Sequence, residues 1–116
     1  MLTHAWSRTV CDSVSVTGTT TLTSAGKDIS LNQSGNAFAG TVGFSGANVN
    51  LRDTTALAVA ASTATGNLTL QSGAAITQTG ALSVTGNTTA TATGDITLNN
   101  ASNSFTGTMG GSGANI

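Results

Sequence analysis

The chain has 116 residues, room for a single domain, and Thr, Ala, Gly, Ser and Asn make up about two thirds of it. Charged residues are only 6% of the chain, the net charge is −1, and there is no Glu and no Pro. This composition excludes a basic nucleic-acid-binding surface, a Glu- and Lys-rich helical bundle and a highly charged disordered chain. One Cys excludes a disulfide scaffold, and no apolar run is long enough for a membrane helix.

The first twelve residues differ from the rest of the chain. Residues 1–12 match no repeat and contain the only His, Trp and Cys, which are His4, Trp6 and Cys11. We expect this atypical segment to be poorly ordered or to form a cap. It has no apolar stretch of the kind found in a signal peptide. Neither His4 nor Cys11 has the neighbouring groups that catalysis or metal binding needs, so we predict no catalytic residue, metal or cofactor here.

Residues 13–116 are built from a long repeat unit of roughly 67 to 68 residues, whose second copy is truncated. The stretch that begins at Ser15 recurs from Ser83 with one deletion. Gly and Asp or Asn suit turns, so we take these recurring residues as turn candidates. Asn36 and Asn103 are also candidate rungs of a hydrogen-bonded ladder between neighbouring turns. The paired turn candidates are Gly26 with Gly94, Asp28 with Asp95, and Asn36 with Asn103.

Five short segments carry two large apolar residues at i and i+2 with a polar residue between them. This period of two predicts strands with one buried face and one wet face, and no window has helical periodicity. We expect these apolar residues to form the ladders of the core. The pairs are Ile29 and Leu31, Val49 and Leu51, Leu68 and Leu70, Leu82 and Val84, and Ile96 and Leu98.

Short strands in near-identical serial modules favour an all-β solenoid. Each segment offers only two core side chains, too few for a two-sheet sandwich, and tight hairpin signals between the strands are poor. We therefore predict a parallel β-helix of about four or five coils, with roughly 20 to 28 residues in each coil.

Several modules, such as residues 66–86 and 91–109, resemble the β-strand repeats of large bacterial surface exoproteins. These are the filamentous-haemagglutinin-like, two-partner-secreted adhesins and the related autotransporter passengers. The resemblance implies a right-handed β-helix shaft at a Gram-negative cell surface, with adjacent repeats of a longer parent chain as its neighbours. It leaves a host-surface protein or an extracellular glycan open as the partner. We predict a non-catalytic shaft segment, with open strand edges that favour end-to-end self-association.

Two alternatives to the shaft stay open. Thr-x-Thr motifs on a flat solenoid face could order water, as in ice-binding solenoids, but the intervals from 21 to 63 and from 93 to 106 break the array. A polysaccharide-acting enzyme would need two carboxylates about 5 to 10 Å apart. Asp28 and Asp95 are separated by several coils, so we expect them to serve turns rather than catalysis.

Overall fold

The computed structural model of the chain describes residues 8–9, 15–24, 26–31 and 35–115, with Arg8–Thr9 described by their backbone alone. All the regular structure in these ranges is β-strand. No helix long and apolar enough to span a membrane occurs in the described part of the chain. The strands are β1 (Arg8–Thr9), β2 (Ser15–Val16), β3 (Thr20–Thr23), β4 (Ile29–Leu31), β5 (Ala37–Phe38), β6 (Thr41–Gly46), β7 (Val49–Asp53), β8 (Leu57–Val59), β9 (Ser62–Ala64), β10 (Leu68–Ser72), β11 (Ile76–Gln78), β12 (Leu82–Val84), β13 (Thr88–Ala92), β14 (Ser104–Phe105) and β15 (Met109–Ser112).

The first sheet contains one strand from each successive coil, in the order β1-β4-β7-β10-β13-β15. All its neighbours are parallel. The register places Val49 beside Leu68, Leu68 beside Thr88 and Thr88 beside Met109. One coil is therefore about 20 residues long, at the lower end of the range expected from the sequence.

The second sheet, in the order β11-β8-β6-β9-β12-β14, contains two short strands from each of two coils, β8 with β9 and β11 with β12. The longer β6 spans both positions, since Thr41 and Val42 pair with β8 while Ser45 and Gly46 pair with β9. On its other side, β6 pairs with β3. All these pairs are parallel, and β2 and β5 form a separate parallel pair.

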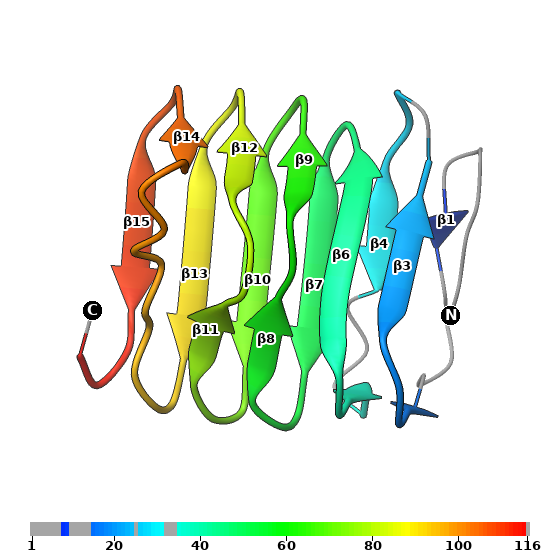
Figure 1. The fold of residues 1–116 in the computed structure, drawn as a ribbon, viewed down its shortest axis with the longest axis vertical. Coiled ribbons are helices and arrows are strands. Elements are labelled where there is room, and N and C mark those ends of the chain that lie inside the picture. The colour runs from blue at the N-terminus through cyan, green and yellow to red at the C-terminus, as the bar shows by residue number, and fades with distance from the viewer. Residues whose placement is uncertain (1–7, 10–14, 25, 32–34, 116) are drawn as a thin grey trace.

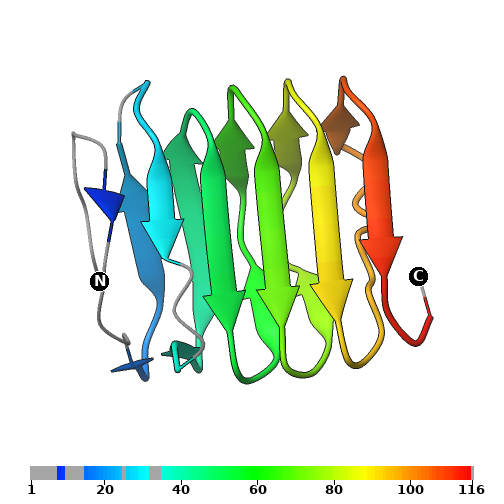
Figure 2. The same ribbon diagram turned by 180° about the vertical axis from the view of Figure 1, so that it is seen from behind.

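The two sheets face each other across a flattened solenoid. In Figure 1 the chain advances from the N-terminus at the right to the C-terminus at the left, rising through the second sheet and descending behind it through the first. Figure 2 shows the first sheet from its own side. This winding is right-handed, as parallel crossovers nearly always are. Six strands in the first sheet correspond to five turns, within extents of 32 × 27 × 20 Å.

The interior is filled by apolar side chains stacked coil upon coil. In the first sheet one ladder runs Ile29, Val49, Leu68, and a second runs Leu31, Leu51, Leu70, Ala90. Of the ten core residues expected from the sequence, all except Leu98 are buried, and Leu98 packs against the core half-buried. The core also includes residues that the sequence did not single out, chiefly Leu22, Phe38, Val42, Phe44, Leu57, Val59 and Ile76.

One expected strand is incomplete. The segment 96–98 forms only an isolated parallel bridge, between Ile96 and Ile76, and Leu98 lies outside any strand. The last coil is one residue longer here, because Ile96 and Ser104 are eight positions apart whereas their register partners Ile76 and Ser83 are seven apart. The extra length lets the chain leave the strand direction after Ile96.

The sequence repeat and the structural coil have different lengths. The repeat unit equals three coils of about 20 residues plus roughly one third of a fourth. Ile29 therefore lies in the first sheet, whereas its sequence counterpart Ile96 pairs with β11 of the second. Likewise Val42 lies in the second sheet and its counterpart Met109 in the first. The two copies occupy different sides of the solenoid.

Candidate functional site

A ladder of Asp and Asn side chains joins successive coils at the turn that enters the first sheet. The backbone N–H of Asn48 donates to Asp28 Oδ1 at 3.1 Å, and that of Asn67 donates to Asn48 Oδ1 at 2.8 Å. The N–H of Asn87 donates to Asn67 Oδ1 at 2.9 Å, and that of Thr108 to Asn87 Oδ1 at 3.1 Å. Four side chains in a row thus satisfy the backbone of the next coil.

Each turn residue is also held through its own backbone. The N–H of Val49 donates to the carbonyl of Asn67 at 2.8 Å, and the N–H of Leu68 donates to that of Asn87 at 2.9 Å. Backbone and side chain of one turn therefore both bond along the solenoid axis. A typical intramolecular hydrogen bond contributes about 0.5–1.5 kcal/mol net, so the ladder adds a modest increment at every coil.

Glycine makes room for these side chains. A Cβ on Gly66 would overlap the side chain of Asn48, and a Cβ on Gly86 would overlap that of Asn67. In the dipeptides Gly66-Asn67 and Gly86-Asn87, the Asn side chain bonds the following coil. The Gly, which has no Cβ, leaves space for the Asn side chain of the preceding coil. Their recurrence one coil apart is the signal in the sequence that marks this ladder.

The two candidate rungs, Asn36 and Asn103, do not stack on each other, because 67 residues correspond to more than three coils of about 20 residues. Each closes a turn in its own coil: Asn36 Nδ2 donates to the Leu31 carbonyl at 2.9 Å, and Asn103 Nδ2 donates to that of Leu98 at 3.3 Å. The long repeat aligns sequence copies, whereas side chains stack at the much shorter period of the coil.

Asn103 also reaches the preceding coil. Its Oδ1 accepts a hydrogen bond from the Leu82 N–H at 2.9 Å and another from Gln78 Nε2, while its Nδ2 donates to Gln78 Oε1 at 3.0 Å. The side chain therefore makes a paired amide contact across the coil boundary. Both Asn residues have structural rather than ligand-binding positions.

The two recurring Asp residues have matching partners on different sides of the solenoid. Asp28 Oδ1 accepts from Asn48 Nδ2 at 3.1 Å, and Asp95 Oδ1 accepts from Asn115 Nδ2 at 3.0 Å. In both cases the partner is the equivalent Asn of the next coil. Each carboxylate is exposed and engaged by that coil, so each serves coil stacking.

The two turn glycines ahead of these Asp residues are used differently. Gly26 has φ of 68°, the left-handed region that glycine adopts without a Cβ clash. A Cβ on Gly94 would lie 3.1 Å from the backbone of Ala74 and Ala75, a tight contact, so glycine eases the close approach between coils there.

A third carboxylate, Asp53, has a role that the sequence did not single out. It is 1% exposed and ends β7 on the inner side of the first sheet. Its Oδ1 accepts from the Phe38 N–H at 3.2 Å and from the N–H and hydroxyl of Thr55 at 2.9 and 2.8 Å. Its Oδ2 is buried with no hydrogen-bond partner. An Asp two positions before Thr at a strand end was the available signal for this turn.

Comparison with known families identifies the repeat family to which the chain belongs. The chain belongs to the family described as "Repeats of unknown function (DUF5649)". Its model matches residues 5–45 and 46–111, so two tandem matches cover most of the chain. No curated protein and no solved structure was found to match. Membership of this family agrees with the serial coils, and it leaves the resemblance to surface adhesins as a proposal.

The described residues include few titratable side chains. A hollow of about 380 Å³ lies beside Arg52 and Asp53, which are its only charged lining residues within the described ranges. Asp53 is already committed to backbone donors, so the hollow does not present the pair of free carboxylates that glycoside hydrolysis uses. No group of three His, Cys, Asp or Glu side chains occurs within residues 15–24, 26–31 and 35–115. His4 and Cys11 lie outside the described residues.

Proposed function

We propose that this chain is a non-catalytic shaft segment of a bacterial cell-surface exoprotein of the filamentous-haemagglutinin-like or autotransporter type. The observation that carries the proposal is the unbroken coil-to-coil register. Every neighbouring pair in both sheets is parallel, and the turn ladder runs from Asp28 to Thr108.

The mechanism of such a shaft is geometric. Backbone hydrogen bonds on two faces and apolar ladders between them resist bending and sliding, because a one-residue slip would expose the core side chains. The outward faces are polar but carry little charge, which keeps the rod hydrated without strong self-repulsion. Rigidity along the axis is what a stalk that projects a binding tip requires.

The local contacts of the repeat support a modular shaft. Residues 28–48 and 95–115 make corresponding hydrogen bonds on different sides of the solenoid. The same sequence unit therefore stacks at more than one position around the coil. In a longer array its neighbours would be adjacent repeats of the parent chain, and its partner at the cell surface would be a protein or glycan.

The test is whether two copies fused in tandem form one continuous rod. Small-angle scattering and electron microscopy of the single and doubled chains would measure the length. Coils stack at about 4.8 Å, so roughly six additional coils should lengthen the rod by about 29 Å at constant width. Two bodies at variable separation would contradict the shaft. Protease treatment of intact source cells, with permeabilised cells as the control, tests surface exposure separately.

A further inference from the structure

We propose that the outer face of the second sheet is an ice-binding surface. Its central feature is a row of hydroxyls, one from each of five successive coils. Register partners place Thr23 beside Ser45, Ser45 beside Thr63, Thr63 beside Ser83 and Ser83 beside Ser104. Four of these side chains are exposed and Thr23 is half-buried.

A second row of hydroxyls runs parallel to the first, two positions further along the chain. The Thr85 N–H donates to the Ala64 carbonyl at 3.0 Å, and the Thr106 N–H donates to the Val84 carbonyl at 2.9 Å. In a parallel ladder these bonds align Thr65, Thr85 and Thr106. All three are exposed, so three coils each present two hydroxyls. We call these two rows the hydroxyl lattice.

The lattice was hidden in the sequence because it mixes Ser with Thr. The motifs are Thr63-x-Thr65, Ser83-x-Thr85 and Ser104-x-Thr106. A search for Thr-x-Thr alone finds one of the three and suggests a broken array. The coil register removes that objection for this face.

The spacing of the lattice suits ordered water. Neighbouring coils lie about 4.8 Å apart, and residues i and i+2 of a strand are about 6.6 Å apart. This near-rectangular repeat is comparable in both directions with the oxygen repeat on a prism face of hexagonal ice. Each water that bridges two polar groups is bound nearly as well as in a direct hydrogen bond, and a repeated array can anchor many such waters at once.

The hydroxyls are free to bind water. Those of Thr63, Ser83 and Thr85 make no hydrogen bond within the described part of the chain, and that of Thr65 makes only one, at 3.5 Å. By contrast, the hydroxyls of Thr54, Thr55 and Thr79 are turned onto other groups of the protein.

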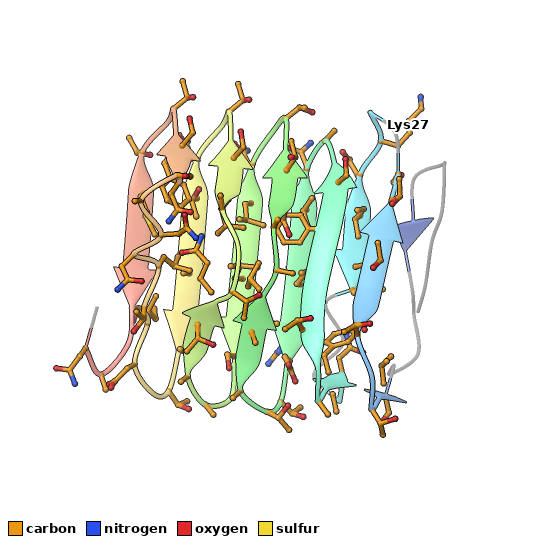
Figure 3. All side chains as sticks on the ribbon, viewed as in Figure 1. Lys27 is labelled. Atoms are coloured by element: carbon orange, nitrogen blue, oxygen red, sulfur yellow. The ribbon has the colours of Figure 1, made fainter. Side chains whose placement is uncertain are left out.

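Charge and composition separate this face from the opposite one. The described strands of the second sheet contain no charged residue, and Lys27 projects from a turn at the edge of the solenoid (Figure 3). The equivalent outer rows of the first sheet mix Asn50, Arg52, Gln71 and Gly110 with hydroxyls, so they offer no uniform lattice. No Phe among the described residues is exposed, so the lattice lacks the aromatic platform on which sugar rings stack.

The experiment measures thermal hysteresis and ice-recrystallisation inhibition of the purified full chain and two matched variants. Thr63→Arg places a bulky cation at the centre of the lattice. Thr89→Arg places the same group on an exposed strand position of the opposite sheet. We expect activity in the parent chain, nearly complete loss in Thr63→Arg, and full retention in Thr89→Arg, with unchanged melting temperatures by circular dichroism.

A second substitution within the lattice, Ser83→Arg, should abolish ice activity as Thr63→Arg does. Agreement between the two variants excludes a folding defect in one of them as the cause. Absence of activity in the parent chain, or equal losses in Thr63→Arg and Thr89→Arg, would overturn the proposal. So would binding to insoluble cellulose or chitin that Thr63→Arg abolishes while no ice activity exists, since the lattice would then recognise polysaccharide.

Discussion

Residues 28–48 and residues 95–115 have closely similar sequences and local contacts, yet they differ in how far a following coil covers them. The N–H of Ile29 donates to the Asn48 carbonyl at 2.8 Å, and that of Ile96 donates to the Asn115 carbonyl at 2.7 Å. The coil from Val49 onward covers the first copy. Within the described residues no coil covers the second.

Burial follows this difference and not the residue type. Phe38 and Leu31 are each 0% exposed, whereas their counterparts Phe105 and Leu98 are only partly buried. In a solenoid the stability of a residue is set by its neighbouring coils. A comparison of residues 28–48 with residues 95–115 therefore tests the effect of a covering coil at a nearly constant local sequence.

The largest expected contrast is at the aromatic position. Phe38→Ala should reduce the free energy of unfolding by about 3–5 kcal/mol, because it leaves a cavity between coils that cannot collapse. Phe105→Ala removes a half-buried ring at an uncovered coil, so it should cost less than half as much. Urea unfolding of both variants measures the difference, and equal losses would break the comparison.

The next contrast is at the close approach of glycine to the preceding coil. A Cβ on Gly46 would lie 2.9 Å from the Lys27 carbonyl, and one on Gly113 would lie 2.9 Å from that of Gly94. Gly46→Ala should cost about 1–3 kcal/mol through overpacking, whereas the exposed Gly113 can relax outward and should cost less. Chemical denaturation of the two variants gives the order, and a larger loss at Gly113 would contradict it.

Gly110 supplies the control for the glycine pair. A Cβ at Gly110 meets nothing within 4 Å, and its φ is not in the left-handed region. Gly110→Ala should therefore be neutral or stabilise the fold by about 0.5 kcal/mol, measured by thermal melting. A large destabilisation would contradict the open surroundings of Gly110.

The turn ladder should give a smaller effect. Asn67→Ala removes the acceptor for the Asn87 N–H. We expect a loss of about 0.5–1.5 kcal/mol and faster hydrogen exchange at the Asn87 amide. Asn99 is exposed and makes no side-chain hydrogen bond within the described residues, so Asn99→Ala should leave stability unchanged. Similar losses of stability for the two variants would contradict a stabilising role of the turn ladder.

The smallest contrast is between the two exposed carboxylates. Asp28→Ala removes an acceptor shared by the side chain and the backbone N–H of Asn48, whereas Asp95→Ala removes a single side-chain contact to Asn115. Since each bond contributes modestly, Asp28→Ala should cost about 1 kcal/mol and Asp95→Ala a few tenths. Paired urea titrations resolve the order, and a reversed order would contradict it.

Much of the fold was predictable because a period of two with two apolar residues per strand is a strong local signal. It located four of the five expected strands and all the expected core ladder positions except Leu98. It did not locate segments such as Ser62–Ala64, whose inward residues are small. The parallel winding followed from the serial modules, and its right-handed sense came from the resemblance alone.

The ladder that begins at Asp28 was not located from the sequence, for one physical reason. The visible sequence repeat is not a whole multiple of the coil, so residues that match in sequence do not stack. Asn36 and Asn103 match in sequence and were candidate rungs, and Asn103 does bond the side-chain amide of Gln78 in the preceding coil. Asn48, Asn67 and Asn87 stack because they recur at the coil length. Asp53 was missed because its role depends on the backbone N–H of Phe38 in the preceding coil.

The most direct test of the account is the in-register, parallel stacking of coils. Two doubly spin-labelled variants, one at Thr63 and Ser83 and one at Thr65 and Thr85, would be compared by electron paramagnetic resonance after Cys11→Ser. Parallel register places both pairs about 5 Å apart, so both spectra should show strong spin–spin broadening. An antiparallel pairing that brings 63 to 83 would bring 65 to 81 instead. Broadening in only one pair, or in neither, would contradict the solenoid.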